Sequence, residues 1–368
     1  MGLKIYSSTL EQGCDVAAHI REAMENIPTG SVCGVIFCGT DPEAEYHRLL
    51  DEVRGSVGST LGHRVPVTLI PQHLLPMGGL RMDIYTVEEA TEIRFAEMQG
   101  VVYGVVEGDG AKMIFIEGIP SSDFSASVRR QSEEVFGKLD TLLAAHGFAV
   151  DDIVRQWNYI GDIVGQREGK QNYQEFNDAR SDYYAKGTWQ KGYPAATGIG
   201  STEGIIVGGI AFKCDSTAIY PIDNPLQVAA HIYSKNVLID DAADAVKSTP
   251  KFERAKLIET ARGAYCFVSG TAAIRGEESV DASSARRQTI RTIENINYLV
   301  SKENLERHGC RPYELECRFL QVFIKNAEDY AEVRAAVEEA YPGVTTIYSI
   351  ADVCRSELLV EIEGILIS

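Results

Sequence analysis

The stretch Met113-Ile-Phe-Ile-Glu-Gly-Ile119 opens the part of the sequence that decides the fold, because it is a short apolar run that ends near a glycine, as buried β-strands do. Residues 131–143 follow with a stripe repeated every three or four positions, which predicts a helix, and Ile153-Val-Arg-Gln-Trp-Asn-Tyr-Ile160 is a second strand-like run. The same strand, helix and strand return at residues 266–271, 288–300 and 319–324.

Both copies also continue in the same way. An aromatic residue and an arginine four positions later open a helix-like stretch, a Tyr-Pro pair follows, and an apolar run ends the copy. These features stand at Phe176–Arg180 and Tyr330–Arg334, at Tyr193-Pro194 and Tyr341-Pro342, and at 204–212 and 358–367. The sequence therefore predicts an α+β fold in which one strand-helix-strand-helix-strand unit occurs twice.

The rest of the chain divides into an N-terminal extension and a connector. In the extension we expect helices at Gln12–Asn26 and Pro42–Val53 and strands at Val32–Phe37 and Val65–Leu69. The connector, Asp215–Glu253, contains prolines and an acidic run, which predicts an irregular segment, and its length suggests that it contributes to a site. We expect two domains, residues 1–225 with the extension and the first copy, and residues 226–368 with the second copy.

The charge balance limits the possible partners. The 368 residues include 35 Lys and Arg against 53 Asp and Glu, a formal net charge of −18. Binding along a phosphate backbone normally requires a basic excess, and anionic lipid head groups repel acidic surfaces. The composition therefore favours a small molecule or another protein over nucleic acid or a membrane, and an anionic substrate would need locally placed Arg or Lys.

The N-terminus and the cysteines predict a cytoplasmic protein. Met1-Gly-Leu-Lys-Ile-Tyr6 does not have the pattern of a signal peptide, and the longest apolar run, near 204–212, is too short for a membrane helix. The eight cysteines form no CxxC pair and most lie in apolar runs, which is typical of reduced thiols. The seven histidines have no ligand spacing, so we expect no metal site.

Two signatures link the repeated unit to a known family. Ser269-Gly270 precedes a helix, and the chain closes with Val360-Glu-Ile-Glu363. These features resemble the Rid (YjgF-like) family, which implies a small, chorismate-mutase-like unit of sheet and helices that commonly forms trimers with sites between subunits. The family's carboxylate-binding arginine after Pro-x is missing from Pro194-Ala-Ala196 and Pro342-Gly-Val344, so we do not expect imine deamination.

A longer set of motifs covers residues 100–368. The motifs are Arg155-x-Trp157-x-Tyr159, Tyr173-x2-Phe176-Asn177-x2-Arg180, Tyr193-Pro-Ala-Ala-Thr-Gly-Ile-Gly200, Asn224-Pro-x-Gln227 with Tyr233, Phe252-x-Arg254-Ala255, Ser269-Gly-Thr-Ala272, and Cys354-Arg355 followed by Glu361. Together they are similar to the chorismatases, enzymes that remove pyruvate from chorismate. The resemblance implies that Glu361 is the catalytic acid. It also implies that Cys354 and Gly270 mark the subtype that forms 3-hydroxybenzoate.

Glu361 also suits this chemistry by its own surroundings. Cleaving the enol ether of chorismate begins with protonation of the enolpyruvyl methylene carbon, which needs an acid that is still protonated near neutral pH. Glu361 lies in an otherwise apolar run, where desolvation raises the pKa of a carboxyl group, and Glu363 places a like charge on the same side of the strand. The alternative is that both glutamates form the polar face of an edge strand.

Gly270 and Cys354 are open to two interpretations. Gly270 would leave room for the substrate ring, and Cys354 would influence the fate of the ring intermediate. Alternatively, Gly270 is only part of a turn and Cys354 is only a small buried residue.

The two substrate carboxylates need cationic partners, and bidentate arginine is the natural choice in so acidic a protein. The predicted substrate-binding residues are Arg155, Arg180, Arg254, Arg355 and Lys235, with Gln227, Tyr173 and Tyr233 as hydrogen-bond partners and Gly270 beside them. Lys235 stands where the chorismatase resemblance predicts an arginine, and any single arginine here has a structural role as its alternative.

Two other motifs are weaker evidence of a functional site. Gly198-Ile-Gly200-Ser-Thr-Glu-Gly204 has one residue too many for a dinucleotide-binding loop and leads into the predicted strand at 204–212. Ser269 has no identifiable histidine partner, so a catalytic triad is not supported.

The sequence thus predicts a chorismatase that forms 3-hydroxybenzoate and pyruvate with neither a metal nor an organic cofactor. The alternatives are a chorismate hydrolase that gives a dihydroxycyclohexadiene carboxylate, and a non-catalytic Rid-like protein that binds small carboxylates. For assembly, a homotrimer and a monomer with internal pseudo-symmetry both remain open.

Overall fold

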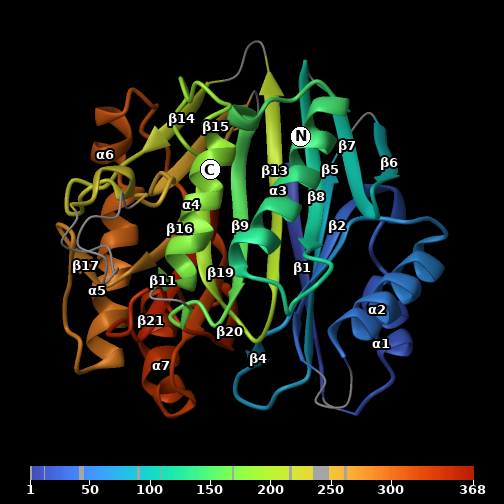
Figure 1. The fold of residues 1–368 in the computed structure, drawn as a ribbon, viewed down its shortest axis with the longest axis horizontal. Coiled ribbons are helices and arrows are strands. Elements are labelled where there is room, and N and C mark those ends of the chain that lie inside the picture. Colours follow the sequence, from blue (N-terminus) through green and yellow to red (C-terminus); the bar gives the residue numbers. More distant parts are fainter. Residues whose placement is uncertain are drawn as a thin grey trace.

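The structure is a computed structural model that describes residues 2–11, 13–40, 45–88, 92–108, 110–167, 170–214, 218–234, 248–260 and 263–368. Three units of sheet and helix lie side by side, with their helices on the outside. In Figure 1 the orange and red helices of the C-terminal unit are on the left, the green helices of the middle unit are in front, and the blue helices of the N-terminal unit are on the right.

The middle unit contains the first predicted copy. Its six strands have the order β12-β9-β13-β8-β7-β6, and the β12–β9 pair is parallel while the other pairs are antiparallel. The strands are β6 (Glu92–Met98), β7 (Val101–Gly108), β8 (Ala111–Pro120), β9 (Ile153–Gly161), β12 (Ala195–Ser201) and β13 (Ile205–Cys214), and the helices are α3 (Val128–Ala145) and α4 (Asn172–Tyr184). Helix α3 buries a stripe that includes Val135 and Leu139, as its spacing predicts.

The C-terminal unit contains the second predicted copy. Its sheet has the order β14-β15-β16-β21-β19-β20-β4, and β19 and β20 are parallel. The strands are β14 (Ile219–Ile222), β15 (Ala255–Thr260), β16 (Gly263–Ala272), β19 (Glu316–Ile324), β20 (Thr345–Ile350) and β21 (Val360–Ile367), and the helices are α5 (Ala285–Leu299), α6 (Lys302–Arg307) and α7 (Tyr330–Ala340). Strand β4 (His73–Leu74) comes from the N-terminal region and extends this sheet.

The N-terminal unit has a four-stranded sheet of order β1-β5-β2-β3. Its strands are β1 (Gly2–Leu10), β2 (Val32–Gly39), β3 (Val67–Ile70) and β5 (Leu80–Glu88), and its helices are α1 (Val16–Met24) and α2 (Tyr46–Leu61). Two short ribbons, β10 (Gln166–Arg167) with β11 (Lys170–Gln171) and β17 (Ile274–Arg275) with β18 (Glu278–Ser279), and the short 3₁₀ helices η1 (Thr29–Ser31), η2 (Val150–Asp152), η3 (Ala230–Ile232) and η5 (Ala327–Asp329) complete the described elements.

All three units share one topology. In each, the strand before the first helix pairs with the last strand, the last strand pairs with the strand between the two principal helices, and that strand pairs in parallel with the strand after the second of them. The N-terminal extension is therefore a third, shorter copy, without counterparts of the first two strands of the other units.

The predicted α+β fold with its two repeated units is confirmed. The expected strands of the extension correspond to β2 and β3, and its expected helices correspond to α1 and α2, while residues 12 and 42–44 of those expectations lie outside the described residues. The connector includes β14, which precedes the expected domain boundary at residue 225 but pairs with β15 of the C-terminal sheet. Its acidic pair at 240–241 lies outside the described residues.

The centre of the molecule joins the three units. Gln72, from the N-terminal region, donates its Nε2 hydrogen to the carbonyl of Gly200 in the middle unit at 2.6 Å and accepts from Ser349 in the C-terminal unit at 3.0 Å. Buried apolar side chains from all three units form one continuous core around this point. Packing of the three inner sheet faces therefore holds the units in fixed positions.

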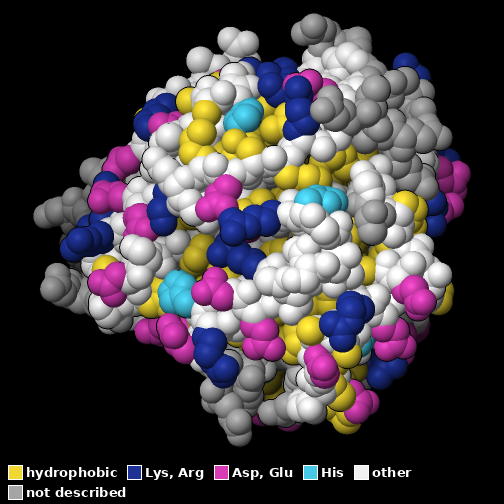
Figure 2. Space-filling view, turned by 90° about the vertical axis from the view of Figure 1, so that its right-hand side faces the viewer, with side chains coloured by type: hydrophobic (Ala, Val, Ile, Leu, Met, Phe, Trp, Pro, Cys, Tyr) yellow, Lys and Arg dark blue, Asp and Glu magenta, His cyan; other side chains and the backbone are white. Residues whose placement is uncertain are grey.

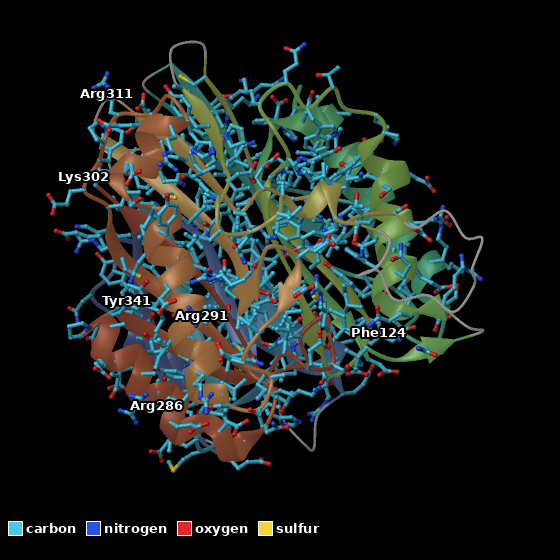
Figure 3. All side chains as sticks on the ribbon, turned by 90° about the vertical axis from the view of Figure 1, so that its left-hand side faces the viewer. Phe124, Arg286, Arg291, Lys302, Arg311 and Tyr341 are labelled. Atoms are coloured by element: carbon cyan, nitrogen blue, oxygen red, sulfur yellow. The ribbon has the colours of Figure 1, made fainter. Side chains whose placement is uncertain are left out.

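The outer surface mixes charges of both signs. On the right-hand side of Figure 1, basic and acidic side chains are interspersed among the described residues (Figure 2). On the opposite side, Arg286, Arg291 and Lys302 lie along the helices of the C-terminal unit, and Phe124 belongs to the neighbouring middle unit (Figure 3). Within the described residues, no helix is long and apolar enough to span a membrane.

Candidate active site

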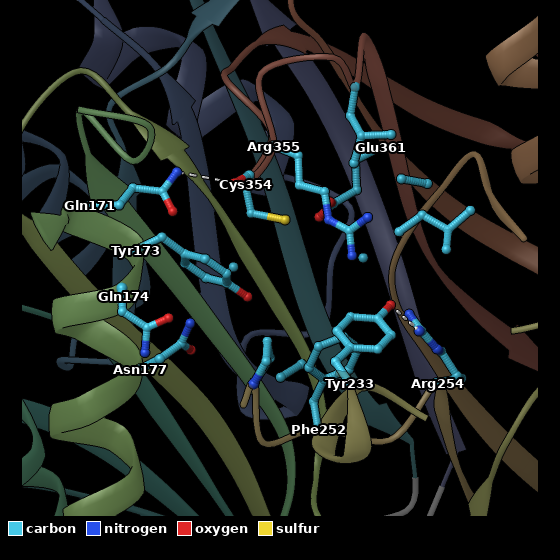
Figure 4. Close-up of a pocket in the computed structure, with 17 residues that line it drawn as sticks. Gln171, Tyr173, Gln174, Asn177, Tyr233, Phe252, Arg254, Cys354, Arg355 and Glu361 are labelled. Atoms are coloured by element: carbon cyan, nitrogen blue, oxygen red, sulfur yellow. Dashed lines mark hydrogen bonds between the residues drawn. The ribbon is translucent and has the colours of Figure 1, made fainter. Parts of the chain in front are cut away.

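A pocket lies between the middle and the C-terminal units (Figure 4). The middle unit contributes residues of β11, α4 and β12, and the facing wall comes from β16, β21, the segment before β21 and the connector. The residues that line the pocket are Gln171, Tyr173, Gln174, Asn177, Ala196, Gly198, Tyr233, Pro250, Phe252, Arg254, Gly270, Ala272, Ile274, Cys354, Arg355, Leu358 and Glu361. Seven of the eleven predicted site residues are among them.

Glu361 is the acidic group of this pocket. It lies on β21 opposite Ala272 of β16 and Phe323 of β19, and only 5 % of it is exposed. Among the described residues, no hydrogen bond or ion pair holds its carboxyl group. Burial raises the pKa of Glu361 to about 8, and the charge of Glu363 acts in the same direction. The carboxyl group therefore keeps its proton at neutral pH.

Gly270 makes room for this carboxyl group. A Cβ atom at position 270 would overlap Oε1 of Glu361 and would lie 3.2 Å from Cγ2 of Thr197. The absence of a side chain is therefore required for the observed position of the acid.

Glu363 lies two residues further along the same strand in a different environment. Its Oε2 atom accepts a hydrogen bond from Nη2 of Arg155 at 2.7 Å and another from the hydroxyl of Thr197, and its Oε1 accepts from Nε1 of Trp157 at 2.9 Å. The guanidinium group of Arg155 lies 4.7 Å from the centre of the Trp157 ring. Two neighbouring carboxyl groups thus have different surroundings: Glu363 accepts hydrogen bonds and pairs directly with a cation, whereas no described residue donates a hydrogen bond to Glu361 or forms an ion pair with it.

Arg254 and Arg355 bring positive charge to the pocket. Nη2 of Arg254 donates to the carbonyl of Val228 at 2.8 Å and to the hydroxyl of Tyr233 at 2.5 Å. Nη1 of Arg355 donates to the carbonyl of Glu277 at 2.8 Å. Both guanidinium groups lie within 5.6 Å of the centre of the Tyr233 ring, so one aromatic face positions both cations.

One hydrogen-bond donor of the pocket has no partner among the described residues. Nε of Arg254 is buried and makes no hydrogen bond to any of them. A buried donor without a partner is costly, so this atom is suited to meet an acceptor atom of a ligand.

Cys354 lies next to the acid as a neutral thiol. Burial and the nearby Glu361 raise the pKa of the Cys354 thiol to about 12. The carbonyl of Cys354 accepts a hydrogen bond from Nε2 of Gln171 at 3.3 Å, which ties its segment to the middle unit. Cys354 is therefore not a thiolate nucleophile at neutral pH.

Three predicted binding residues lie behind the pocket lining instead of in it. Arg155 binds Glu363, Arg180 donates to Oδ1 of Asn177 at 2.5 Å, and Gln227 donates to the carbonyl of Ile274 at 3.3 Å. Each is buried and contacts a group next to the pocket or in its lining. Lys235 lies outside the described residues.

The pocket also contains residues without a predicted role. Asn177 stands inside a motif that the sequence analysis identified, and its spacing of four from Tyr173 on one helix was the available signal. Phe252 likewise stands in a quoted motif, Phe252-x-Arg254-Ala255. Gln171, Gln174 and Pro250 carry no comparable signal, since each follows from how α4 and the connector pack against the C-terminal unit.

The two weaker motifs have structural positions. Residues 198–201 lie in β12, and Gly198 lines the pocket without any following helix. The hydroxyl of Ser269 donates to the carbonyl of Glu253 at 2.6 Å and accepts from the backbone N–H of Ala196 at 2.9 Å, so it joins the two units.

One family model matches part of the chain. Residues 84–211 match the family model described as chorismatase FkbO/Hyg5-like, N-terminal. This part of the chain is thus similar to the N-terminal domain of those chorismatases. This part includes β11, α4 and β12, which form the middle-unit wall of the pocket.

Curated relatives agree with the family model. A 3-hydroxybenzoate synthase from Streptomyces hygroscopicus is 35% identical over 230 residues, which cover 59% of this chain and 64% of the relative. A chorismatase from Streptomyces rapamycinicus is 32% identical over 221 residues, with 58% and 63% covered. The chain thus spans a little under two thirds of the length of the curated relatives it matches.

A solved structure matches over the whole length. A crystal structure of a chorismatase at 1.08 Å resolution superposes with a TM-score of 0.75 at 20% sequence identity, covering 100% of this chain and 99% of the other. At that identity the match establishes the fold. The resemblance to the chorismatases predicted from the sequence is confirmed.

Proposed function

We propose that this protein is a chorismatase that removes pyruvate from chorismate and forms 3-hydroxybenzoate. The observation that carries the proposal is the carboxyl group of Glu361, which holds a proton at neutral pH in a pocket that also contains Arg254 and Arg355. The name of the relative from Streptomyces hygroscopicus supports the choice of product.

Glu361 supplies the proton in the proposed reaction. Its carboxyl group protonates the enolpyruvyl methylene carbon, which leaves positive charge on the ether carbon and negative charge on Glu361. Glu363 and the desolvation of Glu361 both oppose the negative charge that this transfer leaves on Glu361, so that charge needs a compensating cation. Arg254, which acts on Glu361 through its charge, provides that compensation.

The two arginines of the pocket hold the substrate carboxylates. Each keeps part of its guanidinium group engaged with protein carbonyls, which fixes its orientation before substrate arrives. Nε of Arg254, which has no partner among the described residues, and the side-chain amide of Asn177 complete the set of donors. Tyr173 adds a hydroxyl that burial keeps protonated, since its pKa is raised.

Gly270 and Cys354 are proposed to act at the ring. Gly270 keeps the space above the acid free, and the neutral thiol of Cys354 lies in the lining beside it. Pyruvate and 3-hydroxybenzoate together contain the atoms of chorismate, so this outcome consumes no water. The hydrolytic alternative, which gives a dihydroxycyclohexadiene carboxylate, consumes one.

The organisation of the chain fits the proposal. We retain the division into residues 1–225 and 226–368, with the pocket between them and chorismate as the partner. The cysteines are free thiols, which supports action in the reducing cytoplasm.

The test is incubation of the purified protein with chorismate at neutral pH, with chromatography and mass spectrometry of the products. Pyruvate with 3-hydroxybenzoate, absent with Glu361→Gln, is the expected result. Pyruvate with the diene diol would retain the reaction class and reject the product. Unchanged chorismate would reject the enzyme assignment in favour of a carboxylate-binding protein.

A further inference from the structure

We propose that Glu363, Arg155, Thr197 and Trp157 form a positioning network across the interface between two units, and that this network sets the protonation and the place of Glu361. The inference rests on the proposed function for its kinetic consequence, but its structural content can be measured without turnover. None of the four residues lines the pocket.

The network joins two units at one carboxylate. Glu363 belongs to β21 of the C-terminal unit, while Arg155 and Trp157 belong to β9 and Thr197 belongs to β12 of the middle unit. Three donors from the middle unit reach its two oxygens, and only 3 % of Glu363 is exposed. This donor set matches a carboxylate anion, so the negative charge next to Glu361 is fixed when the two units pack together.

Thr197 connects the network to the acid. Its hydroxyl donates to Glu363, accepts from Nη2 of Arg155 at 2.8 Å and accepts from the backbone N–H of Gly270 at 3.1 Å. The carboxyl group of Glu361 lies against Gly270. One hydroxyl therefore fixes both the neighbouring charge and the backbone on which the acid rests.

The charges that face Glu361 come from several elements. Glu363 on β21 opposes ionisation of Glu361, whereas Arg254 and, to a smaller extent, Arg155 on β9 favour it. The Cys354 thiol and the Tyr173 phenol also face it and stay neutral, since burial raises the pKa of both groups. Removing the charge of Glu363 would leave two arginines acting on Glu361 without the opposing charge of Glu363, while the desolvation of Glu361 would remain.

The repeated fold provides an internal comparison. Strand β5 of the N-terminal unit begins at Leu80 as β21 begins at Val360, so Arg81 takes the place of Glu361 and Asp83 the place of Glu363. There, Nε of Arg81 pairs with Oδ1 of Asp83 at 3.3 Å within the same strand.

The position of Arg155 differs in the same comparison. Arg155 pairs with Ala195 in β12, and the matching pair in the C-terminal unit is Phe319 with Thr345. In the N-terminal unit, Arg81 stands at the position that Glu361 has in the C-terminal unit. In the C-terminal unit, the aromatic Phe319 stands at the position that Arg155 has in the middle unit. A cation from across the interface accompanies two adjacent carboxyl groups only at the candidate active site among these described strands.

The experiment compares Glu363→Gln with Asp83→Asn, the same kind of change at the equivalent buried position without an acid beside it. The protonated carboxyl band of Glu361, identified as the infrared band that Glu361→Gln removes, is followed as a function of pH. In Glu363→Gln we expect its titration to move down by about one pH unit or more. We expect no movement in Asp83→Asn, whatever its effect on stability.

Kinetics give the second readout. The alkaline limb of kcat/KM is expected to move down with the band in Glu363→Gln, which for a shift of one pH unit is a loss of about fivefold at the wild-type midpoint. Thr197→Val is expected to lower kcat, and Thr197→Ser, which keeps the hydroxyl, to restore it. A Glu361 band that titrates at the same pH in wild type and folded Glu363→Gln would overturn the inference. Absence of chorismate turnover in the wild type would reject the proposed function alone.

Discussion

The carboxyl group of Glu361 occupies the space in which any side chain at position 270 would stand. Gly270 belongs to β16 and Glu361 to β21, and the two strands pair with a shift of register between Val268 and Thr271. The irregularity lies at the glycine, where it opens the floor of the pocket under the acid. The position of the acid therefore depends on a missing side chain on the neighbouring strand.

Gly270→Ala is expected to displace this carboxyl group and lower kcat at least tenfold while the protein remains folded, because an acid moved by about 1 Å loses alignment with the carbon it protonates. Steady-state kinetics and a melting curve check the result. Gly137→Ala is the matched control, since a Cβ atom on this residue of α3 meets no other atom within 4 Å. Unchanged kcat in Gly270→Ala would contradict the assignment of the acid.

Turnover should depend on the protonated form of Glu361. With a pKa of about 8, the carboxyl group is protonated below this pH and ionised above it. We expect kcat/KM to be level from about pH 6 to 7.5 and to fall tenfold per pH unit well above pH 8. A pH–rate profile checks this expectation, and a fall that begins near pH 5, as for an ordinary carboxyl group, would contradict it.

Glu361→Gln is expected to lower kcat by about 10²- to 10⁴-fold, the usual contribution of a general acid. It should also raise the melting temperature relative to wild type. In the unfolded chain Glu361 ionises near 4.5 and in the folded chain near 8, so the wild type loses stability as the pH rises between these values. The gain from glutamine should therefore grow from pH 4.5 to 8, and a gain that is constant with pH would argue against burial of a protonated carboxyl group.

Arg54 and Glu117 form a buried ion pair between the N-terminal and middle units. Nη2 of Arg54 lies 2.6 Å from Oε1 of Glu117, and the Glu117 side chain is 1 % exposed. Burial raises the pKa of Glu117 to about 7, and Arg54 opposes this rise. Arg54→Ala leaves a buried carboxyl group without its cation, so we expect the free energy of unfolding to fall by about 3 kcal/mol in urea titrations at pH 8.

Arg64→Ala serves as the control for this ion pair. Arg64 pairs with Glu97 at the surface, with side-chain exposures of 74% and 43%. An exposed pair contributes at most about 1 kcal/mol, so this variant should remain close to wild type. Equal losses of unfolding free energy in the two variants would show that the buried pair stabilises the protein no more than the exposed pair does.

We expect the protein to be a monomer, because its three units already pack against one another within one chain. The backbone N–H of Gly118 donates to Thr68 between the N-terminal and middle units at 2.7 Å, and β4 pairs with β20 between the N-terminal and C-terminal units. Gly270 and Thr197 join the remaining interface. Light scattering should therefore give the mass of one chain, 40.4 kDa, and a mass three times larger would indicate that a further interface lies on the outside.

Several strands, including β1 of the third copy, could not be predicted from the sequence. Strand β1 of this copy has exposed residues at Lys4, Tyr6, Ser7 and Thr9. Strand β12 of the middle unit consists of Ala, Gly, Ser, Thr and one Ile, so neither strand contains a long apolar run. Strand β20 begins with two threonines. Such strands are recognised by the partners they pair with, and pairing partners distant in sequence leave no local signal.

The sequence by itself determined the repeated α+β unit, the resemblance to the chorismatases and the choice of Glu361, because hydrophobic periodicity and local motifs are properties of neighbouring residues. The tertiary structure decided which residues share the pocket. It placed Arg254 and Arg355 at the lining and Arg155, Arg180 and Gln227 behind it, although all five are polar residues in comparable motifs. The reason is that the pocket exists only where two units pack, and the direction in which each buried side chain finds its hydrogen-bond partner is fixed by that packing.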